Sequence, residues 1–513
     1  PIAAPPSARE KFRPSGTVLP HLPWVAAVLA APFCFGAVSG EAQAWLAGGV
    51  VISLLGAAML LRPIPRSFPG KLAVAAFFLL AIFSLFPLPH LTRALSPEGM
   101  ALAERFGAAP RLSLAPGETV QRLWQLLLMF AVFAMAREAA LVHRFTGVLS
   151  YGVCLALLAL AASEFWLLAD GKGIWAEVRH YPGGTFANRN HFASWMVMGA
   201  MLAFGGLARK LRHIRRGEAG SRQLAAAGLL GAALLASITA VIACGSRGGM
   251  LALAVGLGYW VLILFRQNAR GTALAVLGVA LAGAVAAFGL WGDLFMERFA
   301  RDAFSFKWRL WQDAAALAAR FPITGIGLGA FEPVFGIYKT FHGEGTMLFA
   351  ENEYLQWVVE TGAIGVLAAG AGAAAWIRIS RRKGPPGRFT KSEFYHGANA
   401  ALAAFAVHAS VEFVAQVMAV ALLAAALLGL SIGLKERATS PAVLPEPGKF
   451  QLSATLLLAA AVCGLALPQA IAGIQWREQE HEKAFLRWPL DEDRAILLAR
   501  EFIAKADQGQ MDA

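Results

Sequence analysis

Charged residues are scarce in this chain. Only 15% of its 513 residues are Asp, Glu, Lys or Arg, whereas 58% are hydrophobic. An ordinary soluble domain has about 25% charged and about 45–50% apolar residues, so the composition argues against a soluble fold. Cysteine is rare as well, because the chain has four and none stands in a CxxC pair or another metal-ligand spacing. Each lies within or at the edge of an apolar block, and we interpret all four as packing residues.

Long hydrophobic blocks fill most of the sequence. These blocks alternate with short charged segments. Each block has about 18–22 residues, the length that an α-helix needs to cross a hydrocarbon core of about 30 Å. The blocks lack the ten-residue alternation of a barrel strand, so the sequence predicts an all-α polytopic membrane protein. We predict about 13 transmembrane helices, beginning near residues 23, 43, 71, 120, 145, 190, 224, 249, 272, 353, 396, 416 and 450.

The net charge of +13 lies mainly in short loops. Residues 209–222 and 378–391 are the two most basic loops, and such loops are cytoplasmic under the positive-inside rule. Because membrane topology accounts for the positive charge, no nucleic-acid partner is expected. With a cytoplasmic N-terminus, alternation places the strongly basic loops on one side and gathers the carboxylates on the other. The predicted organisation is a cytoplasmic segment at 1–22, a transmembrane domain at 23–476 with a periplasmic loop at 292–350, and a short periplasmic helical tail at 477–513.

The predicted loop 292–350 is the largest outer segment. It mixes basic, acidic and aromatic residues, among them Lys307, Arg309 and Tyr338. This composition suits the binding of polar, anionic or sugar-bearing ligands. The alternative is a solvated loop with aromatic residues at the membrane interface.

Two short segments at predicted outer helix ends are unusually polar. The first, Gly184 to Ala193, reads GTFANRNHFA and contains Asn188, Arg189, Asn190 and His191. It predicts a binding segment, or else a glycine turn followed by Asn190 as a helix cap. The second is Ser246-Arg247-Gly248-Gly249. Its arginine is suited to clamp a phosphate, or else reaches the lipid headgroups.

Carboxylates border and enter the span that begins near residue 353. Glu351 precedes the helix at its positive end, where a carboxylate is a candidate cap. Glu353, Gln356 and Glu360 share roughly one helix face, and carboxylates inside a membrane span need a functional or structural reason. Asn352 stands beside them.

Two further features invite a chemical interpretation. His408 and Glu412 are one helical turn apart near the outer end of another span, which favours a structural pair; further metal ligands are lacking. The glycine-rich sequence at 325–329 resembles a phosphate loop only superficially, because no strand and helix of a βαβ unit flank it.

Taken in order, these segments resemble the bacterial O-antigen ligase and O-antigen polymerase superfamily, which includes exopolysaccharide polymerases. The similarity spans about residues 87–430. It is carried by GTFANRNHFA, SRGG at 246–249, RLWQDA with Arg309, PITGIGLGAF at 322–331, ENEYLQWVVETGAIG at 351–365 and VHASVEF at 407–413.

The resemblance implies transfer of a glycan from a polyprenyl pyrophosphate carrier to an acceptor hydroxyl at the outer face of the inner membrane. It implies no metal and no nucleotide. In the ligases a histidine commonly precedes the Asn or Ser of the motif that corresponds to ENEYLQWVVETGAIG, and this chain has Glu351 at that position. That difference favours a polymerase that joins carrier-linked repeat units, with ligation to a lipid A core as the alternative.

The residues allow roles to be assigned for this reaction. Arg247 and Arg309 would neutralise the pyrophosphate leaving group, and Glu351 would accept the proton of the acceptor hydroxyl, with Glu353 as second choice. The predicted substrate-binding residues are Asn188, Arg189, Asn190, His191, Lys307, Tyr338, Asn352, Glu353, Gln356, His408 and Glu412.

Two other functional classes stay open. A flippase or transporter of lipid-linked glycans would explain the spans, but it should also carry charges in the cytoplasmic half of the bundle, where few are found. A non-catalytic scaffold for other polysaccharide assembly proteins is the third class. The expected partners are the carrier-linked donor, a glycan acceptor and the bilayer.

Overall fold

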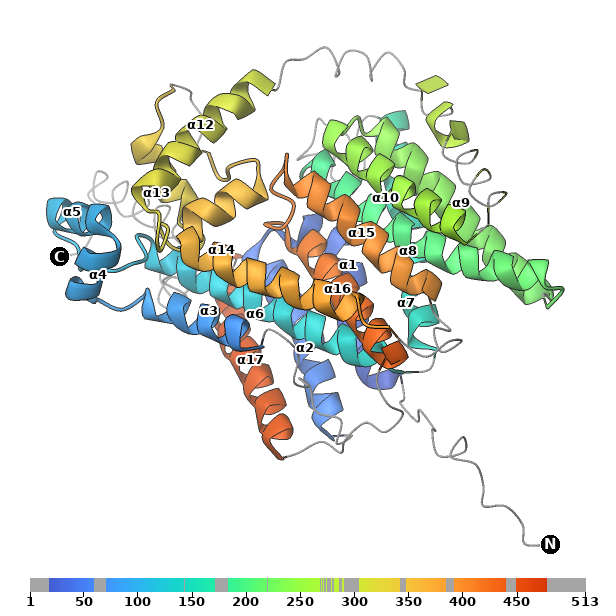
Figure 1. Cartoon of the computed structure of the whole chain (residues 1–513), viewed down its shortest axis with the longest axis horizontal. Coiled ribbons are helices and arrows are strands. Elements are labelled where there is room, and N and C mark those ends of the chain that lie inside the picture. The colour runs from blue at the N-terminus through green and yellow to red at the C-terminus, as the bar shows by residue number, and fades with distance from the viewer. Residues whose placement is uncertain are drawn as a thin grey trace, which may run out of the picture.

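The computed structural model describes residues 18–59, 71–142, 144–170, 183–218, 220–267, parts of 269–289, 304–341, 347–383, 392–439 and 449–477. Within these ranges every regular element is a helix (Figure 1). The predicted all-α class is confirmed. The predicted tail beyond residue 477, most of the cytoplasmic segment at 1–22 and most of the span near residue 272 lie outside the described residues.

Eight of the described helices are long and apolar enough to cross a membrane. They are α2 (Gly40–Met59), α6 (Pro116–Ala139), α7 (Phe145–Asp170), α8 (Arg189–Arg215), α9 (Ser221–Ala243), α10 (Arg247–Arg266), α14 (Glu353–Ser380) and α16 (Met418–Thr439).

Four other helices complete the bundle. They are α1 (Leu22–Ala30), α3 (Lys71–Phe83), α15 (Ser392–Ala409) and α17 (Lys449–Arg477). Apart from the span near residue 272, every predicted span begins within four residues of a helix start. The length and spacing of the apolar blocks therefore predicted a polytopic membrane bundle correctly.

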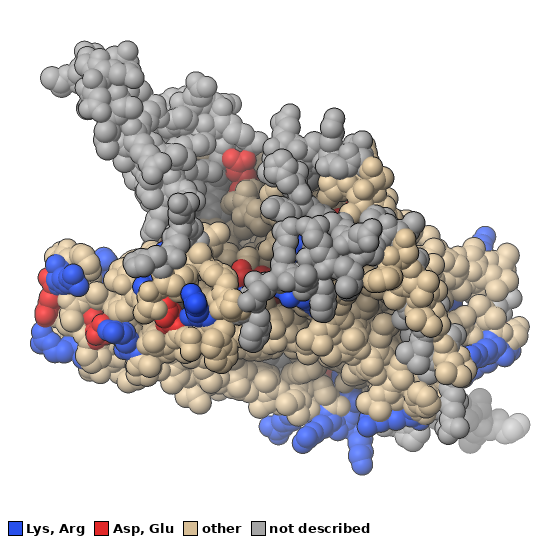
Figure 2. All heavy atoms as spheres, turned by 90° about the horizontal axis from the view of Figure 1, so that it is seen from above, with Lys and Arg blue, Asp and Glu red and all other residues tan. Residues whose placement is uncertain are grey.

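The helices have chemically different ends. Side chains of Asn188, Ser246 and Asn352 cap the N-termini of α8, α10 and α14, and α8, α10, α14 and α16 each carry basic residues in their last turn. Oxygen acceptors suit the free N–H groups of a helix start, and cations suit its negative end. Figure 2 shows a broad uncharged surface with Lys and Arg side chains gathered along its lower edge, as expected for a bundle with one basic face.

The centre of the bundle is built on α8 and α16, whose apolar windows are 89% and 83% buried. Helix α16 packs on α6, and α15 packs on α8, α10 and α16. A helix surrounded on all sides by others is apolar all round, as α16 is. Cys154 and Cys244 are buried in the bundle, whereas Cys34 and Cys463 are exposed, so the prediction of a packing role is wrong for the latter two.

Four helices lie in two of the predicted outer segments. They are α4 (Pro89–Leu95), α5 (Pro97–Phe106), α12 (Phe304–Arg320) and α13 (Phe331–Tyr338), and Figure 1 shows them at one end of the bundle. Arg320 forms an ion pair of 3.1 Å with Glu98, and the Leu114 amide donates to the Ile326 carbonyl at 2.9 Å. The two segments therefore lie on the same side, as the alternation of spans predicts.

The described part of 292–350 is a small helical unit with its own core. Its almost fully buried residues include Leu310 of α12, Phe321 directly after α12, and Phe331 and Phe335 of α13. Phe331 and Phe335 stack with ring centroids 4.7 Å apart. A buried core of this kind argues against the alternative of a solvated loop.

Helix α14 is interrupted at Gly362, whose φ of 56° lies in the left-handed region that favours glycine. The segment before α13 supplies the missing backbone partners on both sides of the break. The Gly327 amide donates to the Glu360 carbonyl at 3.0 Å, and the Ala363 amide donates to the Pro322 carbonyl at 2.9 Å. Irregular backbone is tolerated at membrane depth where protein satisfies it, and here it is satisfied.

The glycine-rich segment 325–329 is the loop that fills this break. Gly325, Gly327 and Gly329 all have positive φ, and the Gly329 amide donates to the Glu360 carboxylate at 3.0 Å. A Cβ on Gly325 would lie 2.3 Å from the Glu360 carbonyl carbon. The glycines therefore serve close backbone packing, in agreement with the interpretation that this is no phosphate loop.

Candidate functional site

Lys307, in the first turn of α12, is surrounded by three oxygen acceptors. Its Nζ lies 2.9 Å from Glu351 Oε2 and 3.5 Å from Glu412 Oε2, and it donates to the Val411 carbonyl at 2.6 Å. An ammonium has three N–H donors, and these three contacts match them. The side chains of Lys307 and Glu351 are 22% and 26% exposed, whereas that of Glu412 is 3% exposed. The two carboxylates thus share one cation at the border between buried and accessible space.

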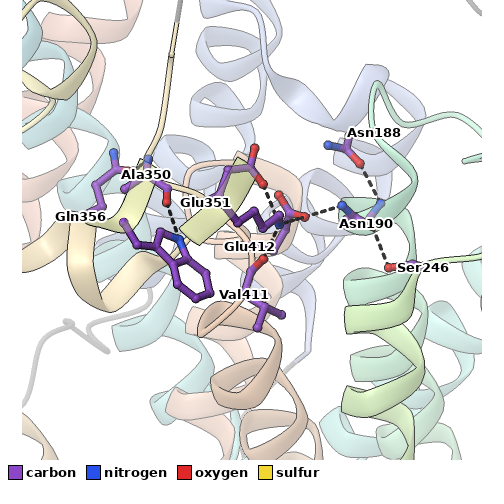
Figure 3. A network of polar contacts seen from close by, with 10 residues as sticks. Asn188, Asn190, Ser246, Ala350, Glu351, Gln356, Val411 and Glu412 are labelled. Atoms are coloured by element: carbon purple, nitrogen blue, oxygen red, sulfur yellow. Dashed lines mark hydrogen bonds and ion pairs between the residues drawn. The ribbon is translucent and has the colours of Figure 1, made fainter. Parts of the chain in front are cut away.

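The network continues from Glu412 into two more helices (Figure 3). The Asn190 amide donates to Glu412 Oε2, and Ser246 Oγ donates to Asn190 Oδ1 at 2.8 Å. Ser246 Oγ in turn accepts the Gly249 amide as the N-cap of α10. Contacts therefore run from the start of α10 through the start of α8 to the 410–417 turn and α12. We call Asn190, Ser246, Lys307, Glu351 and Glu412 the outer polar network.

Glu412 is a carboxylate whose protonation the surroundings perturb. It lies in the turn between α15 and α16. Burial raises the pKa of Glu412 and the Glu351 carboxylate raises it further, while the Lys307 ammonium lowers it. Two carboxylates close together do not both ionise readily, which favours the protonated form of Glu412.

Glu351 has an unusual backbone. Its φ is 53°, which a residue other than glycine rarely adopts. It is not the cap of α14, the role that its place before the helix suggested, because Asn352 is the N-cap and accepts the Leu355 amide at 3.0 Å. The strained conformation places the Glu351 side chain toward Glu412 (Figure 3).

The other α14 residues are anchored within the protein. Glu353, the second choice as a base, accepts the backbone amides of Ala415 and Gln416 at 2.5 and 3.1 Å and the Gln416 side-chain amide at 2.9 Å. Gln356 donates to Glu360 at 2.9 Å. These contacts hold the 410–417 turn and the break in α14, which is a structural use of both intramembrane carboxylates.

Both candidate histidines are buried. His191 packs edge-on against Phe413 with ring centroids 4.6 Å apart. His408 is 1% exposed, and neither of its ring nitrogens has a hydrogen-bond partner among the described residues. The predicted pair of His408 with Glu412 is therefore wrong, since α15 ends at Ala409 and Glu412 turns toward Lys307 and Asn190.

The structure separates the remaining candidates. Asn188 is the N-cap of α8 and accepts the Asn190 amide at 2.8 Å, so the cap is Asn188 and not Asn190. Arg189 is half-buried beside it. The Tyr338 hydroxyl donates to Glu98 at 3.0 Å, a contact that ties α13 to α5 and lies apart from the outer polar network.

Arg247 and Arg309 have exposed side chains. Arg247 is the first residue of α10 after Ser246, and Arg309 lies two residues after Lys307 on α12. Both are neighbours in sequence of network residues. Their convergence with Glu351 at the mouth of one cavity stays a prediction.

Three important residues were not predicted from the sequence. Ser246 was part of a motif without a role of its own. Glu164 lies in the last third of α7, and its carboxylate accepts the Gly183 and Gly184 amides at 2.7 and 2.6 Å, which fixes the turn before α8. Arg122 of α6 is buried within electrostatic reach of Glu353 and Glu360. A charge within an apolar block is the signal that would have found the last two.

The described residues contain no group of three or more His, Cys, Asp or Glu side chains able to hold a metal ion. The chemistry that the site offers is that of carboxylates, one ammonium, amides and hydroxyls, and two residues adjacent to it in sequence, Arg247 and Arg309, carry exposed guanidinium groups. Such a set suits proton transfer from a hydroxyl beside a polyanionic leaving group.

Residues 232–370 match the family model described as O-antigen ligase. The match confirms the resemblance to the O-antigen ligase and polymerase superfamily. It contains Ser246, Lys307 and Glu351, whereas Asn190 and Glu412 lie outside it and reach the same network through the fold. No curated protein matches the chain. The chain is thus a multi-pass membrane protein similar to glycosyltransferases that act on O-antigen.

Proposed function

We propose that this protein transfers a glycan repeat unit from an undecaprenyl pyrophosphate carrier to an acceptor sugar hydroxyl on the periplasmic face, as a surface polysaccharide polymerase. One observation carries the proposal. The outer polar network gathers Asn190, Ser246, Lys307, Glu351 and Glu412 from separate segments, at helix ends opposite the basic last turns. The family match supports the same class of reaction.

Glu351 is the base in this proposal. Its ion pair with Lys307 orients the carboxylate, and its partial exposure leaves it accessible to an acceptor. The acceptor hydroxyl gives its proton to Glu351, its oxygen bonds to the anomeric carbon, and the bond from that carbon to the pyrophosphate breaks. Direct displacement of this kind inverts the anomeric centre, whereas a covalent glycosyl-enzyme would retain it.

Arg247 and Arg309 neutralise the pyrophosphate that leaves. Both are exposed next to residues of the outer polar network. The planar guanidinium fork pairs with phosphate through two hydrogen bonds, and an ammonium group cannot reproduce that geometry. The proposed reaction calls for no metal or nucleotide.

Ligation to a lipid A core or to another acceptor is the second candidate. The description of the matching family favours it, and Glu351 in place of the usual ligase histidine speaks for polymerisation. Products distinguish the two, because a polymerase lengthens carrier-linked chains and a ligase transfers the glycan to a different acceptor.

The decisive experiment uses the purified chain in nanodiscs with a carrier-linked repeat unit, with and without a lipid A core acceptor. Glu351→Gln should keep the fold and lower turnover by about 10²–10⁴-fold, because the amide accepts no proton. Arg247→Lys and Arg309→Lys should weaken use of the carrier strongly. Glu351→His restores the ligase-like residue and should keep part of the activity.

Glu98→Gln is the matched control, because Glu98 is an ion-paired glutamate of the same outer end without a role in the network. It should leave turnover unchanged. Undiminished product from a folded Glu351→Gln variant removes Glu351 from the mechanism.

A further inference from the structure

A cavity of about 200 Å³ lies at the other end of α8 from the outer polar network. It is formed by the first turns of α7, the end of α8, α9 and the start of α15. Asn190 and Arg209 are 19 residues apart on α8, which corresponds to roughly 28 Å along the helix. The cavity is therefore about one hydrocarbon thickness away from the network, beside the basic loops that the positive-inside rule predicts to be cytoplasmic.

The cavity is basic. Arg144, Arg209 and Lys210 line it, and none of its described lining residues is acidic. Aromatic rings position two of the cations, since the Arg209 guanidinium lies 5.8 Å from the Phe394 ring centroid and the Lys210 ammonium 6.0 Å from that of Tyr151. Contacts with aromatic rings restrict these cationic side chains before binding, so less conformational entropy is lost when they bind an anion.

A buried hydroxyl also faces the cavity. Ser150 lines it, is 2% exposed, and its Oγ has no hydrogen-bond partner in the part of the chain that the structure describes. Leaving a buried hydroxyl without a partner costs about 1–3 kcal/mol, so such a group points to a ligand acceptor. Thr146, one helical turn earlier, lines the same cavity.

Arg144 is held in a strained conformation at the rim. Its φ is 72°, a region that disfavours side chains other than those of glycine, asparagine and aspartate. It directly precedes α7 and is exposed. Backbone strain of this kind often marks a functional position, and here it accompanies a third cation in the lining of the cavity.

We propose that this cavity binds the phosphate group of an anionic phospholipid headgroup from the adjacent leaflet. Three cations and a donor hydroxyl suit a phosphodiester, and the apolar walls formed by Leu230 and Gly206 suit the start of the lipid chains. A free phosphate ion has the same chemistry in its oxygens, but it would leave these walls without a partner. The proposal stands independently of the glycan transfer proposed above.

The test is native mass spectrometry of the full chain released from nanodiscs that contain phosphatidylcholine with a minor fraction of phosphatidylglycerol. Phosphatidylglycerol should be retained in preference to phosphatidylcholine. Arg209→Gln with Lys210→Gln should weaken that retention about 30-fold, as expected for two cations near a lipid surface. Arg215→Gln with Arg216→Gln removes the same charge from the same helix end outside the cavity, and should leave retention unchanged.

Arg144→Asn keeps the test decisive even if the double variant does not fold. Asparagine suits a positive φ, so the variant should fold at least as well as the original chain while it retains less phosphatidylglycerol, by about fivefold. Equal retention in all variants overturns the proposal. Stabilisation by inorganic phosphate in nanodiscs of phosphatidylcholine alone, without preference for phosphatidylglycerol, overturns the lipid as the source of the phosphate.

Discussion

Replacing Lys307 with methionine removes the cation that the two carboxylates of the outer polar network share. Methionine fills a similar volume, so the packing of α12 changes little. The Val411 carbonyl, Glu351 and Glu412 lose their common donor, which holds them at 2.6, 2.9 and 3.5 Å. The variant therefore isolates the charge of Lys307 from its shape.

The cost of this change follows from how each carboxylate responds. A fully buried ion pair that loses one partner is destabilised by about 3–5 kcal/mol. Glu412 avoids most of this cost by keeping its proton, because burial and Glu351 already raise its pKa. Glu351 is 26% exposed and is partly solvated. We expect a loss of about 2 kcal/mol, close to the value of one charge-assisted hydrogen bond.

Thermal unfolding in nanodiscs measures this loss, as a decrease of the midpoint by a few degrees. Lys307→Met with Glu351→Gln should recover at least half of it, because the uncompensated charge is then gone. Lys339→Met is the control, since Lys339 forms no ion pair among the described residues. A double variant that is as unstable as the single one would refute the reasoning, because the loss would then come from packing alone.

Three further predictions use other features. Gly325→Ala should destabilise the protein by about 2 kcal/mol or more, because its Cβ would meet the Glu360 backbone at 2.3 Å, while Gly336→Ala, with nothing within 4 Å, should be neutral in the same unfolding assay. Glu412→Gln should flatten the dependence of stability on pH. In the folded protein the Glu412 carboxyl keeps its proton above its ordinary pKa of 4.5, so the stability that it contributes is lost as the pH rises from there. Unfolding midpoints measured from about pH 5 to about pH 9 check this. In a background without exposed native cysteines, Gly336→Cys should react with an impermeant thiol reagent added outside intact cells and Arg216→Cys should not; the reverse pattern contradicts the predicted topology.

The membrane bundle was accessible from sequence because its signal is local. An apolar block of span length between charged loops is seldom anything but a membrane helix, so helices begin close to nearly all predicted positions. The sorting of basic loops also brought residues 89–119 and 292–350 to one side, and the contact of Arg320 with Glu98 agrees. Both inferences need only neighbouring residues and the properties of a bilayer.

The details of the site depend on contacts between distant segments, and here sequence reasoning was weaker. Glu351 and Glu412 were both selected as candidates, yet their common cation Lys307 was only one of several basic residues in a long segment. The pairing of His408 with Glu412 assumed that a helix continues for one more turn, and α15 ends before it does. Several polar residues in a row also made the cap of α8 ambiguous, because Asn188 and Asn190 are chemically equivalent candidates.

The break in α14 has a consequence for biosynthesis. An uninterrupted helix satisfies its own backbone and can enter lipid alone, but a helix broken at Gly362 exposes unpaired amides and carbonyls until residues 322–327 bond to them. Those residues precede α14 in the chain and are translated first. The segment that pairs with the break is therefore synthesised before α14. In a circularly permuted chain that begins at α14, this helix would enter the membrane with the backbone groups at its break unpaired.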